Sequence, residues 1–239
     1  QSIPTAGAIG TAQTICSGTA PAMLTSVTDG TGSGTISYEW IANGGGSSLA
    51  SSATYSPPSL SATTSYQRRT VSTLNGTACY SAYTTPVTIS IDNIAPVWST
   101  AANALNSTIQ CSDVAAISAA RALAPIASDN YSSVTYTKTS GAFVAGSCAN
   151  TGTYTNTWVA KDVCLNTSTT FTQIINIQDT TAPTWTTTAN ALNSTIQCSD
   201  AAAITAAQGL APVATDNCGT ITYTKTSGAF VAGSCANTG

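Results

Sequence analysis

The sequence contains no histidine and little charge, since only 6% of its 239 residues are Asp, Glu, Lys or Arg. Without an imidazole, Ser-His-Asp and Cys-His catalysis and most zinc sites are excluded. Six basic against nine acidic residues offer no cationic surface to a nucleic acid. No run of 18 apolar residues occurs, so we expect no membrane span in this segment. Gly-x-Ser-x-Gly is also absent, and we expect no catalytic residues and no enzyme activity.

Hydroxyl and thiol side chains are abundant instead. The chain has 44 Thr and 30 Ser residues, which indicates a neutral, hydrated surface. Its eight cysteines include no Cys-x-x-Cys pair, a spacing that favours disulfides over thiolate metal ligands. Disulfides indicate an oxidising, extracellular compartment. The first ten residues lack the basic start and apolar core of a signal peptide, so we expect a processed product or an internal piece of a longer protein.

An internal repeat with a period of 87 residues organises the rest of the chain. Residues 97–152 match residues 184–239, with 13 differences in 56 aligned positions. The first copy continues to the next junction, whereas the second stops at Gly239. We therefore expect the second copy to lack its closing strands and the chain to belong to a longer array.

These features predict an all-β chain of tandem immunoglobulin-like β-sandwich domains in a linear array. The expected domains are residues 1–94, residues 95–181 and the incomplete residues 182–239. The junctions are Asp92-Asn93-Ile94-Ala95-Pro96 and Asp179-Thr180-Thr181-Ala182-Pro183. Because proline restricts its own backbone and the residue before it, we expect short, stiff linkers that place the domains end to end.

Alternating apolar residues predict the strands. In the first domain the alternating sets are Ile36, Tyr38, Trp40 and Val87, Ile89, Ile91; in the repeat they are Val134, Tyr136, Lys138 and Phe171, Gln173, Ile175, Ile177. One segment in each copy departs from this period. The alanine-rich residues 112–125 and 199–212, each ending in proline, predict one short helix per repeat.

The cysteines predict a disulfide within each domain. Cys16 and Cys79 are the two cysteines of the first domain. Cys111 and Cys148 recur as Cys198 and Cys235, so we favour bridges within each of these pairs. A complete unit would carry four cysteines, for which three connectivities are open. This prediction leaves Cys164 and Cys218 unpaired or uncertain.

The repeat also contains a set of distinctive short motifs. They are APVW and APTW at the junctions, STIQCSD, ATDNCGT, YTKTSGAFVAGSC and TWVAKDVCLNTS. Together they resemble hyalin-type (HYR-like) immunoglobulin-like repeats of Bacteroidetes surface proteins, which include SprB-type gliding-motility adhesins. The leading domain, with QTIC, YEW and SYQRRTVS, is similar to the PKD-like or Ig-like modules found beside such repeats.

The resemblance implies export by type IX secretion to the bacterial cell surface, with gliding and secretion machinery and neighbouring domains of the same chain as partners. Two positions depart from the family pattern. Tyr131 stands where the family has the cysteine of Asp-Asn-Cys, and Leu165 replaces the glycine of Cys-Gly-Asn. Both departures place the second bridge of the first copy in doubt.

Three kinds of binding or modification site are candidates. Asp92, Asp129 and Asp162 could hold Ca2+, because hard oxygen ligands suit that ion and the first junction is similar to the calcium-binding linkers of cadherins. They could equally be turn formers. By resemblance to the acceptor sites of this bacterial group, Thr180 is a candidate for O-glycosylation.

Exposed aromatic residues offer the third candidate. Trp98, Trp185 and Tyr131 could stack on sugar rings, or the tryptophans could pack against a neighbouring domain. The leading functional hypothesis is a spacer in a very long adhesin whose attachment to surface polysaccharide or a solid substratum occurs through the parent protein. The alternatives are a carbohydrate-binding module of a secreted protein and a filament subunit that assembles by strand donation.

Overall fold

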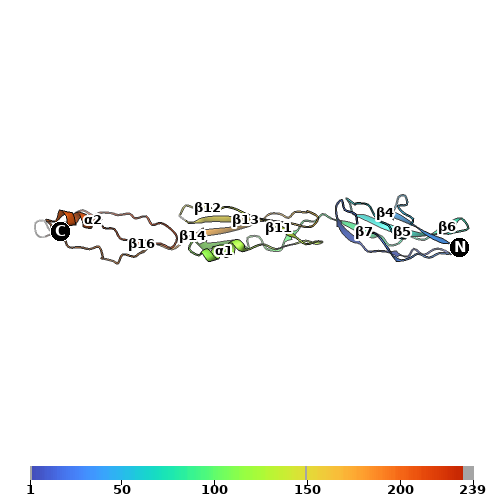
Figure 1. Cartoon of the computed structure of the whole chain (residues 1–239), viewed down its shortest axis with the longest axis horizontal. Coiled ribbons are helices and arrows are strands. Elements are labelled where there is room, and N and C mark those ends of the chain that lie inside the picture. Colours follow the sequence, from blue (N-terminus) through green and yellow to red (C-terminus); the bar gives the residue numbers. More distant parts are fainter. Residues whose placement is uncertain (1, 149, 234–239) are drawn as a thin grey trace. The chain divides into compact units, whose positions relative to one another are not determined.

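The computed structural model describes residues 2–148 and 150–233 as a mostly β structure with two helices (Figure 1). The chain divides into two compact units. Unit 1 comprises residues 1–100, 126–137 and 158–170, and unit 2 comprises residues 101–125, 138–157 and 171–239. This division cuts through the second predicted domain, residues 95–181, so the domain boundaries stay a prediction.

Residues 13–92 form a five-stranded sheet in unit 1. Its strands are β2 (Gln13–Cys16), β4 (Thr35–Ala42), β5 (Thr64–Leu74), β6 (Thr77–Tyr80) and β7 (Val87–Asp92). The order is β2-β7-β5-β4, with β6 beside β5. β2 and β7 run parallel, and the other neighbours run antiparallel. A smaller antiparallel pair is formed by β1 (Ala8–Ile9) and β3 (Ser26–Thr28).

The core of unit 1 lies between these two sets of strands. The buried cluster consists of Ile9, Leu24, Trp40, Leu60, Tyr66, Val87 and Ile89. Ile9 comes from β1, whereas Trp40 and Ile89 come from the larger sheet, so two layers pack face to face as in a β-sandwich. The alternation predicted for Val87, Ile89 and Ile91 holds for the first two, which are buried on either side of the less buried Thr88, but it is wrong at the end of the strand, where Asp92 is buried and Ile91 is only partly so.

A buried arginine also connects the two layers of unit 1. Arg68 on β5 is fully buried. Its guanidinium donates to Ser26 Oγ at 2.9 Å and to the carbonyl of Thr28 at 3.2 Å, and it lies 4.3 Å from the centre of the Tyr38 ring. Burial lowers the pKa of this guanidinium. These hydrogen bonds offset part of the cost of burying the charge.

A second five-stranded sheet follows with the same arrangement. Its strands are β9 (Ser107–Gln110), β11 (Thr135–Ser140), β12 (Val144–Ala145), β13 (Gly152–Lys161) and β14 (Phe171–Gln178). The order is β11-β13-β14-β9, with β12 beside β13, and β14 runs parallel to β9 as β7 does to β2. β8 (Val97–Trp98) and β10 (Ala127–Ser128) form an antiparallel pair in unit 1.

The burial of these strands tests the predicted alternation. In β14 every second residue from Phe171 to Ile177 is buried, which confirms that pattern. The strand expected at Val134, Tyr136 and Lys138 is present as β11, but all of its residues are exposed. β11 is at the end of the strand order, and neither of its faces is buried.

The predicted helices are both present and shorter than expected. α1 spans Val114–Ala122, and α2 spans Ala201–Gly209. Asp113 caps α1 by accepting a hydrogen bond from the Ala116 N–H at 2.9 Å, and Asp200 caps α2 in the same way. In the second copy, β15 (Thr184–Trp185) pairs with β16 (Ala214–Thr215), as β8 pairs with β10.

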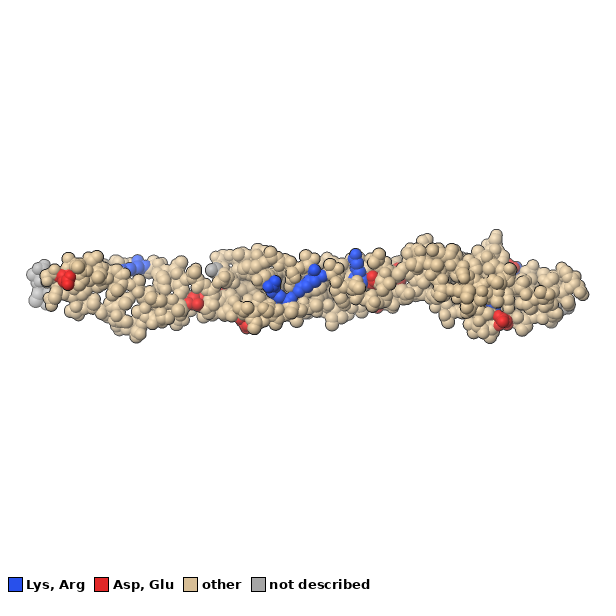
Figure 2. All heavy atoms as spheres, viewed as in Figure 1, with Lys and Arg blue, Asp and Glu red and all other residues tan. Residues whose placement is uncertain are grey.

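The surface is largely uncharged. Figure 2 shows few acidic and basic side chains on the visible face, in agreement with the composition. In the described residues, neither helix has the length and apolar character needed to cross a bilayer.

Candidate functional site

Parallel strand pairing places a cysteine beside each junction aspartate. Cys16, the last residue of β2, is the register partner of Asp92, the last residue of β7. Cys111 directly follows β9, and its N–H donates to the carbonyl of Gln178 at 2.9 Å, next to Asp179. Each predicted linker therefore starts at the same end of its sheet as one of these cysteines.

Two disulfides form at these positions. Cys16 is bonded to Cys164 in unit 1, with 5.0 Å between their Cα atoms. Cys111 is bonded to Cys218 in unit 2, with 5.7 Å between their Cα atoms. Cys164 and Cys218, which the sequence leaves unpaired or uncertain, are therefore both bonded. Each disulfide joins residues of consecutive predicted domains.

The predicted bridge between Cys16 and Cys79 is also wrong, and the strand order explains why. Cys79 lies on β6 opposite Ser72, near the β5–β6 turn. At the other end of β5, Thr64 lies opposite Ile89. Cys16 is therefore separated from Cys79 by roughly the length of β5, on the order of 30 Å at the rise of a strand. A disulfide requires Cα atoms within about 7 Å.

The predicted pair Cys111–Cys148 is wrong for a different reason. Because Cys111 is bonded to Cys218, its predicted partner Cys148 is free and exposed. Cys198, the expected partner of Cys235, is free and exposed as well. Cys235 lies outside the described residues. Cys79 is free and partly buried.

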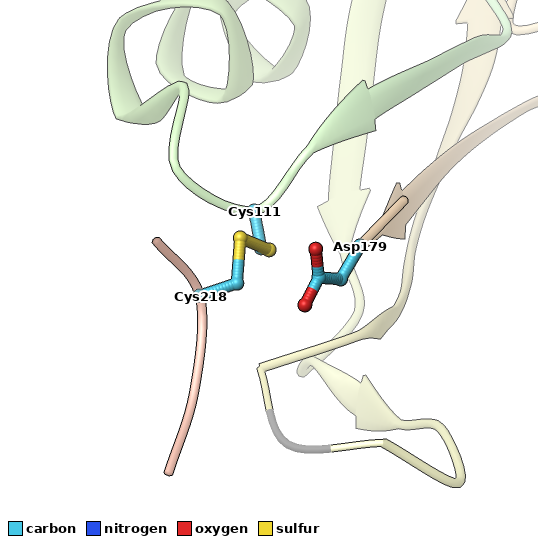
Figure 3. A group of neighbouring side chains, drawn as sticks. All are labelled: Cys111, Asp179 and Cys218. Atoms are coloured by element: carbon cyan, nitrogen blue, oxygen red, sulfur yellow. A yellow bond between two sulfur atoms is a disulfide. The ribbon is translucent and has the colours of Figure 1, made fainter. Parts of the chain in front are cut away.

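An aspartate accompanies the second disulfide. Figure 3 shows the carboxylate of Asp179 facing the bond between Cys111 and Cys218, with ligand atoms of the three residues within 4.8 Å of one another. Because both sulfurs are in a disulfide, they cannot act as thiolate metal ligands. Asn150 donates to the carbonyl of Cys218, and Asn217 donates to Ser112 Oγ at 3.0 Å. Polar contacts thus surround this disulfide.

Three aspartates meet in unit 1. The structure brings together Asp92, Asp129 and Asp162, which the sequence identified as calcium candidates, with carboxylate oxygens within 4.8 Å of one another. Asp92 ends β7, Asp129 follows β10, and Asp162 follows β13. Asp92 and Asp162 are 5% and 3% exposed, so water has little access to two of the three carboxylates.

Local hydrogen bonds orient these carboxylates. Asp92 Oδ1 accepts from the Ile94 N–H at 3.3 Å, and Asp129 Oδ2 accepts from the Tyr131 N–H at 2.9 Å. Asp162 accepts from the backbone and the side chain of Asn166. The hydrogen bond from Tyr131, with others from Ser132 and Asn130, lowers the pKa of Asp129 despite opposing desolvation. The turn-forming role predicted as the alternative is therefore present together with the cluster.

The aromatic candidates are not equivalent. Trp98 Nε1 donates to the carbonyl of Thr169 at 2.8 Å, and its ring centre lies 6.1 Å from that of Tyr136. Tyr131 is 45% exposed and Trp185 is 60% exposed. Trp185 lines a cavity of about 280 Å³ with Leu192 and Asn193 among its other walls.

In the first copy, the residues equivalent to two walls of that cavity form hydrogen bonds with a strand. Leu105 and Asn106 are the residues equivalent to Leu192 and Asn193. The carbonyl of Leu105 accepts from Gln173 at 2.9 Å, and Asn106 Oδ1 accepts from the Ile174 N–H at 2.8 Å. In the first copy these positions therefore hold β14.

Thr180 is exposed, and its Oγ1 is within 2.5 Å of Gln110 Nε2, from which it accepts a hydrogen bond. Its N–H donates to the Gln110 side chain at 3.2 Å. The hydroxyl is accessible at the surface, and its glycosylation stays a prediction.

Comparison with known proteins gives limited matches. Residues 5–93 match a family described as a domain of unknown function (DUF8696). No curated protein matches the sequence. Among solved structures, Drosophila N-cadherin EC1-4 is similar with 12% identity and a TM-score of 0.34, over 75% of this chain and 50% of that one. The chain thus spans half the length of that structure.

Fibronectin(III)-like modules of CbhA from Clostridium thermocellum are similar with 14% identity and a TM-score of 0.27, over 74% of this chain and 94% of theirs.

Proposed function

We propose that this chain is a spacer segment of a long secreted adhesin, in which disulfides connect consecutive Ig-like modules. The observation that carries the proposal is the cysteine pairing. Cys16 and Cys111 are each bonded to a residue of the following predicted domain, Cys164 and Cys218 respectively. A bond inside a module would stabilise that module alone, whereas a bond between modules also prevents their separation under load.

The composition supports the same function. Disulfides are maintained in oxidising compartments outside the cytoplasm. Because only 6% of the residues are charged, few surface interactions are electrostatic, and salt should change the stability of the chain little. Modules with their own cores can be duplicated without redesign of the chain, and the 87-residue repeat is such a duplication.

The finer assignment rests on the resemblance to HYR-like repeats. On that basis we propose that the segment belongs to a gliding-motility adhesin of a bacterial cell surface, exported by type IX secretion and in contact with the gliding machinery. Attachment to surface polysaccharide or a solid substratum would then occur through other parts of the parent protein.

The mass and location of the native polypeptide test this proposal. An antibody raised against this chain should detect, on non-reducing gels of the source cells, a polypeptide far larger than 23.9 kDa. Protease added to intact cells should remove that signal, and an antibody to a cytoplasmic protein should show no change. A native species near 23.9 kDa, or one that the protease cannot reach, would contradict the proposal.

The cavity beside Trp185 favours carbohydrate binding as a second candidate function, because sugar rings stack on exposed aromatic faces. Its equivalent in the first copy holds β14, which favours a structural role. A glycan array probed with the disulfide-bonded chain separates the two. Binding that is lost in Trp185→Ala and retained in Tyr223→Phe would establish the carbohydrate site, whereas the spacer predicts no binding by any of the three proteins.

A further inference from the structure

The aspartate cluster of unit 1 is built by three strand ends that are distant in the sequence. Asp92 is the last residue of β7, and Asp129 and Asp162 directly follow β10 and β13. Strand ends are better fixed than the middle of a long loop, since ladder hydrogen bonds hold the preceding residue. The three carboxylates are therefore held together by the fold.

Holding three carboxylates together requires a compensating positive charge. Their oxygens lie within 4.8 Å of one another, and Asp92 and Asp162 are almost fully buried. In the described part of the chain, the salt bridge is between Arg69 and Glu39, and no lysine or arginine forms one with the three aspartates. Like charges at this separation and burial repel strongly unless a cation lies between them or one carboxylate is protonated.

Two carboxylate oxygens in the cluster have no hydrogen-bond donor. Asp92 Oδ2 and Asp129 Oδ1 are both buried and have no partner among the residues that the structure describes, although Asp92 Oδ1 and Asp129 Oδ2 each accept from a backbone N–H. A buried acceptor without a donor is rare in folded proteins. A metal ion bound to these two oxygens would satisfy them.

The available ligands select the type of ion. The cluster offers carboxylate oxygens, the chain has no histidine, and the nearby Cys16 and Cys164 are bonded to each other. An all-oxygen set of several carboxylates suits Ca2+, whose remaining positions can be filled by backbone carbonyls and water. We propose that Asp92, Asp129 and Asp162 bind one Ca2+ ion in unit 1.

A titration of the disulfide-bonded, EDTA-treated chain with CaCl2, followed by 1H–15N NMR, tests this site. The amide signals of residues 92–94, 129–132 and 162–166 should shift in a saturable manner, with a Kd of about 0.1–1 mM, as in extracellular modules. Asp92→Asn and Asp129→Asn should each raise the Kd by about tenfold or more. Asp129 is the less buried of the two, so its variant should retain the fold, which the same spectra report.

Asp179→Asn is the matched control. Asp179 accepts a hydrogen bond from the Thr181 N–H at 3.0 Å, as Asp92 does from Ile94, but its cluster contains a disulfide instead of two carboxylates. The Kd of this variant should equal that of the wild type. The proposal is overturned if no saturable shift occurs up to about 10 mM CaCl2, if a folded Asp129→Asn variant keeps the wild-type Kd, or if MgCl2 binds as tightly.

Discussion

Cys16 and Cys111 occupy equivalent places at the ends of their sheets, yet their partners occupy different positions in the following copy. Cys111 is bonded to Cys218, whose equivalent in the first copy is Tyr131. Cys16 is instead bonded to Cys164. Each partner lies two residues after an aspartate, Asp216 or Asp162. Two alternative cysteine positions can therefore serve the same connection.

The presence of Tyr131 in place of this cysteine is a sequence signal of the observed pairing. The first copy lacks a cysteine at position 131 but has Cys164, as expected if either position can supply the partner. The prediction instead pairs Cys111 with Cys148, because both cysteines recur in the second copy. The three aspartates are candidates in the sequence because carboxylate oxygens suit Ca2+ and the first junction is similar to the calcium-binding linkers of cadherins. Their convergence could not be predicted, since it depends on three strand ends far apart in the sequence.

Cys164→Ser should test the pairing at the residue scale. It should free the thiol of Cys16 and lower the free energy of unfolding by about 4–5 kcal/mol, because the bond closes a segment of 148 residues. Thiol labelling with mass spectrometry and urea unfolding measure the two effects. Cys79→Ser is the control, as Cys79 is free; labelling of Cys16 in that variant would contradict the bond between Cys16 and Cys164.

At the scale of elements, local pattern predicted more than topology. Both helices are predicted because alanine content and a following proline are local signals. β14 is predicted because Phe171, Gln173, Ile175 and Ile177 alternate in the sequence, and the structure buries these residues. The parallel pairing of β2 with β7 and of β9 with β14 has no local signature, and this pairing is what places Cys16 and Cys111 at the junctions.

Gln173 connects three elements of unit 2. Its Nε2 donates to the carbonyls of Leu105 and Ala120, each at 2.9 Å, and its Oε1 accepts from Asn156 Nδ2 at 2.9 Å. Gln173 is fully buried on β14, Ala120 belongs to α1, and Asn156 is buried on β13. A polar residue in an otherwise apolar alternation thus fixes α1 against the sheet.

Gln173→Leu should destabilise the protein by about 3 kcal/mol or more, because two carbonyls and an amide lose their partner while they remain buried. Thr172→Val, on the exposed face of the same strand, should change the free energy of unfolding by less than about 0.5 kcal/mol. Urea unfolding followed by circular dichroism compares the two. Equal effects in both variants would show that the hydrogen bonds of Gln173 contribute little.

For the whole molecule, the missing histidine predicts how stability depends on pH. Histidine is the side chain whose ordinary pKa lies between pH 5 and 8, so with excess CaCl2 to neutralise the three clustered aspartates, the free energy of unfolding should vary by less than about 0.5 kcal/mol between pH 5.5 and 7.5. The pKa of Asp129 is lowered from 3.8 in the folded chain, so its stabilising effect is present above that value and is lost as the pH falls through the folded-state pKa. Thermal unfolding across pH 3–8 measures this profile, and a transition near pH 6.5 would contradict it.

The disulfides also predict how the chain responds to force. Pulled from its ends until every element unfolds, the oxidised chain cannot extend the 148 residues between Cys16 and Cys164. Reduction should therefore lengthen the unfolded chain by about 500 Å, at 3.3–3.6 Å per residue. Single-molecule force spectroscopy with and without a reductant measures this difference.

Two variants make this experiment specific to the pairing. Cys111→Ser removes the bond to Cys218 but keeps the bond between Cys16 and Cys164, which still prevents 148 residues from extending. Because Cys111 lies between Cys16 and Cys164, this variant should leave the oxidised length almost unchanged. Cys16→Ser should leave only the 107 residues between Cys111 and Cys218 hidden, about 360 Å. If the bonds closed individual domains instead, Cys111→Ser would lengthen the oxidised chain. An unchanged length in Cys111→Ser therefore requires bonds that overlap along the sequence, the arrangement that keeps consecutive modules connected under load.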